Sequence, residues 1–460
     1  MKRVLDLLQT LDYMRMVVGI CILVDGYPLI FFMRETLRLA PGSTVFTAAA
    51  LAGGLVLMVP FTVLRRLYRP NLTMLWLGLG FLALAIFYMF VYNGAGQSPG
   101  AGGVDKDLIY YTYILLFLFL LVNMPNDIIR VFIPVVVLFT LVSNMGLIYS
   151  LLTNPSWAVG QRAAITIGGN DEASGNPHAF SRNAYMGVVA CAIWLLRSET
   201  SVVFRLLAFF AGVLNVIVLV LTQTRSAILA LIVAVVFFAY FNVRPKQIRH
   251  AVRELLTPIP IIIMAVGFVG ILVLIQRFSA GYGILYSYGI SFMERNLDNV
   301  YALLGMKAAG TNFQATLDDS AVYRSISAQF FSNVIEGHLP DLIFGYGYKY
   351  IYLDVPILES LTDQGIFGFV LFAGLNVMIL YYVLGIMRRN PNPLSVFLAY
   401  FYMLVLVQLF TNGRPYDISF WFPLALMIRF VGVDHLFPAY LSDNPADRPD
   451  ESFVVVSSPA

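Results

Sequence analysis

Charged residues are scarce in this chain of 460 amino acids, of which they make up only 12%. Soluble domains usually carry about 25% charged residues. Hydrophobic residues reach 59% instead, and apolar runs long enough to cross a bilayer recur from one end of the sequence to the other. The short alternating segments of a membrane β-barrel are missing. The composition therefore predicts an all-α polytopic membrane protein and argues against a soluble domain.

Cysteine and metal-binding patterns are equally rare. Cys21 and Cys191 are the only two cysteines, and both lie within apolar runs. Two isolated thiols supply neither a disulfide framework nor the ligand spacing of a zinc site. P-loop and Rossmann glycine patterns are missing too, as are HxxE and DxD clusters. We therefore expect no metal and no cofactor, and the net charge of +3 is too small to predict nucleic-acid binding.

Apolar segments that are candidate membrane spans occur along most of the chain. We expect about twelve, near residues 14–33, 42–64, 73–93, 107–123, 127–152, 178–197, 202–223, 225–242, 257–279, 356–387, 393–412 and 417–436. The chain thus divides into nine spans within 1–279, a large polar loop over 280–355, three spans within 356–436 and a polar tail over 437–460. The tail is polar and contains proline, so we expect it to be disordered.

The distribution of arginine and lysine between the loops predicts the orientation, because basic loops tend to remain cytoplasmic. When the N-terminus is placed inside, the basic turns around Arg65, Arg249 and Arg388 also fall inside. Arg34 and Arg38, in the first outer loop, count against this parity. Both termini are therefore expected in the cytoplasm of a bacterial cell, with the large polar loop in the periplasm.

Polar and charged residues are concentrated on the predicted outer face. A salt bridge or a lipid-headgroup contact is the ordinary role of any single outer cation, but arginine also offers planar, bidentate donors to phosphate oxygens. A transporter coupled to ions usually needs ionisable groups near the midplane, where only Asp25 stands out here. The candidates for binding a phosphate or diphosphate are Arg162, Arg182, Arg225, Arg324, Lys349 and Arg414.

The large polar loop contains a predicted amphipathic helix. Apolar residues recur every four positions from Val322 to Val334, so residues 320–336 are expected to lie as a helix near the outer surface. Gly337 is suited to end this helix, and His338 follows it. A neutral imidazole at this position suits the removal of a proton from an attacking hydroxyl, although a helix C-terminus favours the protonated form.

Four stretches resemble motifs of the bacterial O-antigen ligase and polymerase superfamily, and most closely those of O-antigen ligases. They are GNPHAFSRNAY at the sixth span, LTQTRSAILAL around Arg225, YRSISAQFFSNVIEGHLPDLIFGYG with Arg324, Gly345 and Gly347, and ILESLTDQGIFGFVLF at the tenth span. The resemblance covers residues 165–390. Its specificity lies in the order and spacing of the stretches, because no single motif is specific.

The resemblance implies a GT-C-like glycosyltransferase fold and a metal-independent reaction at the periplasmic face of the inner membrane. O-antigen polysaccharide would move from undecaprenyl diphosphate to a hydroxyl of lipid A–core, with the outer cations holding the donor diphosphate. Many members carry a His-Asn pair at the position where this chain has Asp354 and Val355. The general base is therefore His338 or, alternatively, Asp354.

Other functions remain open at this stage. An O-antigen polymerase would use the same donor with another lipid-linked chain as acceptor. A protein O-glycosylating ligase fits less well, because such proteins often carry a substantial extra C-terminal portion. A flippase of lipid-linked glycans would need a charged passage across the membrane, and an assembly protein would need no catalytic residue.

Overall fold

The computed structural model describes most of the helical part of the chain. The described residues are 2–60, 67–91, 104–155, 157, 161–165, 177–197, 201–242, 339–388 and 392–433, with residues 276, 277, 283, 286, 289, 290, 293, 297, 329, 330, 333, 334 and 337. Every regular element among them is a helix, and no β-strand occurs within these ranges. The prediction of an all-α chain is thereby confirmed.

Most of the longer helices coincide with predicted spans, but α1 begins at Lys2 and ends at Asp25, whereas the first span is predicted at 14–33. The longer helices are α1 (Lys2–Asp25), α3 (Thr44–Met58), α4 (Leu72–Val91), α5 (Val104–Asn123), α6 (Ile129–Thr153), α7 (Pro177–Leu196), α8 (Val202–Leu221), α9 (Arg225–Asn242), α15 (Pro356–Met387), α16 (Pro393–Gln408) and α17 (Ile418–Phe430). Short helices join them: α2 (Tyr27–Phe31), the π-helix η1 (Phe32–Thr36) and the 3-10 helices η2 (Asn126–Ile128) and η3 (Leu339–Ile343). The span near 257–279 lies outside the described residues except for 276 and 277, as does the tail over 437–460.

Six of the described helical segments are long and apolar enough to cross a membrane, and four shorter helices are also apolar. The six are Asp6–Asp25, Leu72–Val91, Asn126–Thr153, Pro177–Leu196, Val202–Leu221 and Pro356–Met387. Large apolar side chains on these segments, such as Trp76, Leu152 and Phe210, are exposed. Lipid is the solvent that accepts such a surface, so the structure supports a membrane-embedded helical protein.

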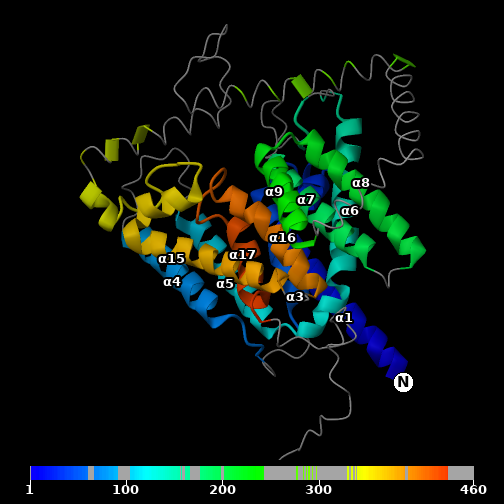
Figure 1. Cartoon of the computed structure of the whole chain (residues 1–460), viewed down its shortest axis with the longest axis horizontal. Coiled ribbons are helices and arrows are strands. Elements are labelled where there is room, and N and C mark those ends of the chain that lie inside the picture. Colours follow the sequence, from blue (N-terminus) through cyan, green and yellow to red (C-terminus); the bar gives the residue numbers. More distant parts are fainter. Residues whose placement is uncertain are drawn as a thin grey trace, which may run out of the picture.

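The helices pack through small residues and buried amides. α7 contacts both α6 and α8, and Figure 1 shows α8 at the edge of the bundle. Gly187 on α7 leaves room for the side chain of Asn215 on α8. The amide of Asn144 on α6 donates to Asn215 Oδ1 at 2.6 Å and to Asn183 Oδ1 at 3.1 Å. Close approach of this kind is typical of helices that associate in lipid, where apolar burial alone gives no driving force.

Arg34, one of the two arginines that count against the predicted orientation, is buried. Its guanidinium donates to Glu35 Oε1 at 2.6 Å and to Thr47 Oγ1 at 2.7 Å. The charge of Arg34 is therefore balanced inside the fold, and this residue has a structural role that the loop-charge rule does not address.

A break in α15 organises the region that carries most of the polar side chains. Gly365 has φ 68° and ψ −162°, which interrupts the helix one quarter of the way along. This left-handed backbone is readily available to glycine because it has no Cβ atom. α15 packs against α4, and the segment of η3 lies on α15 close to the break (Figure 1).

Candidate functional site

The segment after η3 is fixed to α15 by backbone hydrogen bonds at the break. Tyr346 N donates to Thr362 O at 2.8 Å, and Gly347 N donates to Asp363 O at 3.0 Å. These carbonyls precede Gly365, where the regular helical pattern is interrupted, so the loop takes the place of the next helical turn. The backbones touch because Gly345 and Gly365 face one another. The glycines that carry much of the family resemblance thus form one close contact between backbones.

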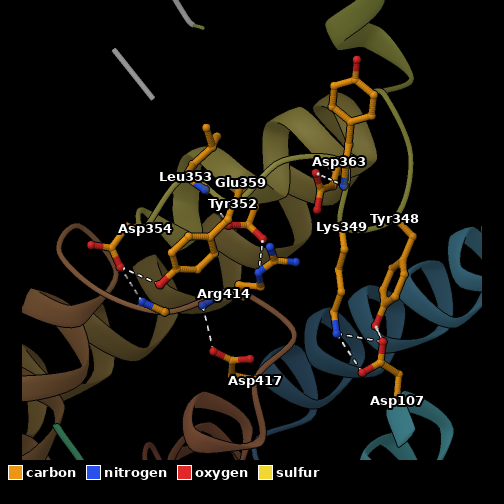
Figure 2. A network of polar contacts seen from close by, with 12 residues as sticks. Asp107, Tyr348, Lys349, Tyr352, Leu353, Asp354, Glu359, Asp363, Arg414 and Asp417 are labelled. Carbon is orange, nitrogen blue, oxygen red and sulfur yellow. Dashed lines mark hydrogen bonds and ion pairs between the residues drawn. The ribbon is translucent and has the colours of Figure 1, made fainter. Parts of the chain in front are cut away.

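Seven charged side chains gather around this contact, as Figure 2 shows. They come from α5, from the loop before α15, from α15 itself and from the turn between α16 and α17. Five are acidic and two are basic, so in this cluster carboxylates outnumber the cations that the sequence predicts for binding phosphate. The acidic members are Asp107, Asp354, Glu359, Asp363 and Asp417, and the basic members are Lys349 and Arg414.

Lys349 is held on one side of the cluster by Asp107. Its Nζ lies 2.7 Å from Asp107 Oδ1 and 2.8 Å from Oδ2. Tyr348 Oη donates to the same carboxylate at 3.2 Å and lies 3.0 Å from Tyr111 Oη. Burial raises the pKa of Tyr348 above its ordinary value, so the phenol stays protonated and keeps a proton to donate. The lysine is therefore part of a buried polar contact between α5 and the loop.

Replacing Lys349 with methionine is expected to destabilise the protein by roughly 3 kcal/mol, because it leaves Asp107 buried without its cation. The side chains of Lys349 and Asp107 are only 12% and 6% exposed, so water compensates little. Thermal unfolding in detergent measures the effect. The double variant Asp107→Asn/Lys349→Met should recover part of the loss, whereas an equal loss in the single and double variants would show that the charge pair is not the cause.

Arg414 is held on the other side of the cluster. Its Nε lies 3.4 Å from Glu359 Oε1, and its guanidinium stacks on the ring of Tyr352 at 4.9 Å. The backbone N–H of Arg414 donates to Asp417 Oδ2 at 3.0 Å. Burial raises the pKa of Asp417, while that hydrogen bond favours its charged form. These contacts fix the turn between α16 and α17 against α15.

Asp354, the alternative base, joins the loop to the same turn. Its Oδ1 accepts the hydroxyl of Tyr352 at 2.9 Å and the backbone N–H of Gly413 at 3.3 Å. Asp354 is buried and has φ 56°, a left-handed conformation that is uncommon for residues other than glycine. Lys349 has φ 52°. Backbone strain of this kind clusters at functional sites, so its presence at two residues of the cluster supports a functional role.

A polar pocket of about 370 Å³ lies beside the cluster. α2, α5, α7 and the turn before α17 contribute its walls, which include Lys106, His178, Arg182, Tyr352 and Asp417. Three of these side chains carry or can carry positive charge. The pocket is therefore a place where an anionic group can meet cations from two different helices.

Arg182 reaches this pocket from α7 while it is held by the protein. It forms an ion pair with Asp25 at the end of α1 and donates to Ser419 O at 2.9 Å and to Val24 O at 3.1 Å. Asn183 donates to the backbone carbonyl of Asp25 at 2.9 Å. Asp25 thus fixes the position of the arginine. Asp25, the ionisable residue that stands out in the first predicted span, is therefore paired with a residue of the sixth predicted span.

The remaining predicted cations divide into two groups. Arg162 lies beside the end of α8, where Ala163 N donates to Leu221 O at 2.9 Å, and Arg225 begins α9; neither lines the polar pocket. Arg225 follows a buried polar turn in which Gln223 has φ 50°. Arg324 and His338 lie outside the described residues, as does most of the predicted helix over 320–336. Of the six cations, the structure brings Arg182, Lys349 and Arg414 to the region of the cluster and the pocket.

Several polar residues of the region are missed by the sequence prediction. Lys106 and Asp107 stand in the first turn of α5, and Tyr352 follows the glycine-rich turn. Glu359 and Asp363 are four residues apart near the start of a mostly apolar helix, which places them on one helix face. Two acidic residues at that spacing are a signal that a polar site lies at this end of the helix.

The described part of the region shows no candidate metal site. Among the residues that the structure describes, no three histidine, cysteine, aspartate or glutamate side chains are grouped so as to hold a metal ion. Comparison with family models and with curated proteins finds no match for this chain.

Proposed function

We propose that this chain is a lipid-linked glycosyltransferase, an O-antigen ligase that works at the periplasmic face of the bacterial inner membrane. It would transfer O-antigen polysaccharide from undecaprenyl diphosphate to a hydroxyl of lipid A–core without metal or cofactor. In this proposal the chain crosses the membrane twelve times, has a GT-C-like fold and keeps both termini in the cytoplasm.

The polar pocket is the observation that carries this proposal. It lies at the beginning of α7 and the end of α16, which are the helix ends predicted to face the periplasm. Its wall includes His178 and Arg182 from GNPHAFSRNAY and Tyr352, which closely follows IFGYG. One stretch that resembles the O-antigen ligases therefore meets, at one polar cavity in an apolar, membrane-embedded bundle, a residue that lies five positions beyond the end of a second such stretch.

Different residues in and near the pocket are suited to different parts of the transfer reaction. Lys106 and Arg182 are suited to neutralise the donor diphosphate, which would favour its departure from the anomeric carbon. The acceptor oxygen forms the new glycosidic bond as its proton passes to a base, and undecaprenyl diphosphate leaves with the bonding electrons. His338 remains the proposed base. The contact between Tyr352 and Asp354 supports the alternative, because Tyr352, whose hydroxyl donates to that carboxylate, also lines the pocket.

The polymerase is the main alternative, since the same pocket would serve the same donor. A flippase is less well supported, because a cavity formed by α7, α9 and α16 is lined almost entirely by apolar side chains and does not provide a charged passage. The ligase, the polymerase and the flippase predict different products in a reconstituted assay.

The purified protein should be reconstituted with undecaprenyl-diphosphate-linked O-antigen, with and without lipid A–core, and without nucleotide or divalent metal. A product ladder that requires lipid A–core would support the ligase, and longer chains on the donor lipid alone would support the polymerase. We expect His338→Ala to lower the rate by about 100-fold or more, the usual contribution of a general base. Loss in Asp354→Asn instead would move that role to Asp354, and no product from the wild type in any lane would contradict a transferase.

A further inference from the structure

A second cavity, of about 550 Å³, opens on the side of the bundle away from the polar pocket. α7, α9 and α16 contribute most of its wall, together with the end of α15. We call it the lateral groove. Leu196, Val235 and Phe238 line it and remain 74%, 60% and 41% exposed, so the groove opens toward the surroundings of the bundle. In a membrane those surroundings are lipid chains.

The lateral groove lies at the opposite end of the bundle from the polar pocket. α7 contributes its first residues to the pocket and its last residues to the groove, and α16 does the reverse. The pocket takes its α7 residues from 178–182 and the groove from 188–196, so the midpoints of the two sites lie about 18 Å apart along the helix at 1.5 Å per residue. The predicted orientation places the groove in the cytoplasmic leaflet.

Positive charge marks the cytoplasmic end of the groove. Arg197 lines it directly after α7, and Arg205 in the first turns of α8 donates to the backbone carbonyl of Arg197 at 3.2 Å. Arg388 follows Met387, which also lines the groove. Basic pockets between helices on the cytoplasmic side are suited to anionic lipid headgroups.

We propose that the lateral groove binds an anionic phospholipid of the cytoplasmic leaflet. One acyl chain would occupy the apolar groove, and the phosphate would lie against Arg197. The volume falls within the roughly 300–1,000 Å³ of small-molecule sites, and the lining is apolar apart from its charged end. This combination matches a lipid with an apolar chain and an anionic head. The inference does not depend on the transferase proposal.

Two variants test the two halves of the site separately. Arg197→Gln removes the charge at the headgroup end, and Ala192→Trp places a large side chain on α7 where an exposed alanine lines the groove. Arg130→Gln is the matched control for charge. Arg130 is also predicted to lie at the cytoplasmic end, but it pairs with Asp127, is 54% exposed and does not line the groove.

Each protein should be purified in detergent and titrated with phosphatidylglycerol and with phosphatidylcholine, and the bound lipid counted by native mass spectrometry. We expect Arg197→Gln to lower the preference for phosphatidylglycerol about fivefold, which corresponds to about 1 kcal/mol per basic residue near anionic lipid. Ala192→Trp should weaken binding of both lipids, and Arg130→Gln should behave as wild type. Unchanged binding in both groove variants, as expected if residues 257–279 of the chain fill the groove, would overturn the proposal, as would an equal change in Arg130→Gln.

Discussion

Replacing Gly365 with alanine is expected to destabilise the protein by about 2–5 kcal/mol. A left-handed backbone costs a residue with a Cβ atom roughly 1–2 kcal/mol, and forced overlap in a packed interior typically adds another 1–3 kcal/mol. An added Cβ at Gly365 would lie 2.6 Å from the carbonyl carbon of Phe344, and neither backbone can retreat without breaking the hydrogen bonds of the loop. The loop should therefore detach from α15, with loss of thermal stability in detergent and of any activity that depends on the cluster.

Gly385→Ala is the matched control because Gly385 lies in the same helix. A Cβ added there meets nothing within 4 Å, and alanine is the better helix former by about 1 kcal/mol. We expect its melting temperature to equal or exceed that of the wild type. Gly345→Ala should behave like Gly365→Ala, because its added Cβ would lie 2.5 Å from Gly365 N. Equal melting temperatures for Gly365→Ala and Gly385→Ala would contradict the contact.

Replacing Arg414 with glutamine is expected to destabilise the protein by about 3–5 kcal/mol, an effect as large as that of Gly365→Ala. Glu359 and Asp363 are fully buried, and Arg414 is the cation that faces Glu359 at 3.4 Å. Removing one partner of a buried pair leaves the other charge without compensation, which costs more than the pair itself contributes. Chemical or thermal unfolding in detergent measures the loss.

The double variant Glu359→Gln/Arg414→Gln separates charge from packing. It removes both members of the pair, so we expect it to be more stable than Arg414→Gln alone by about 1–3 kcal/mol. Glu359→Gln retains the shape of the side chain and provides the third corner of the cycle. If the two single losses simply add in the double variant, Glu359 and Arg414 are not coupled and the cluster needs another explanation.

The positions of the helices are predictable because a membrane span is defined locally. About 20 successive apolar residues satisfy their own backbone groups whatever their neighbours are. The predicted spans at 178–197 and 202–223 accordingly agree with α7 and α8 within a few residues. The break at Gly365 is not predictable in this way, because the loop over Ile343–Gly347 supplies the hydrogen bonds that allow it.

The partners of the predicted site residues depend on the fold. Arg182 is predicted as a cation of the outer face, and the partner of its ion pair, Asp25, lies 157 residues away in the sequence. Lys349 pairs with Asp107 over 242 residues. A sequence shows that such charges exist and not which of them meet. Asp107, Glu359 and Asp363 are missed for this reason, although the spacing of Glu359 and Asp363 near the start of a mostly apolar helix already indicates a polar site.

The central claim is that the polar pocket holds the diphosphate end of a lipid-linked donor, and Lys106 provides the most direct test. Its side chain is exposed, lines the pocket and lies over the ring of Tyr110, so Lys106→Met removes a charge without opening the core. Binding of undecaprenyl-diphosphate-linked O-antigen to the purified protein should be measured for the wild type, Lys106→Met and the control Arg130→Gln. We expect about tenfold weaker binding in Lys106→Met alone, since a hydrogen bond to a charged group contributes about 1.5 kcal/mol or more. Equal affinity in all three proteins would contradict the claim.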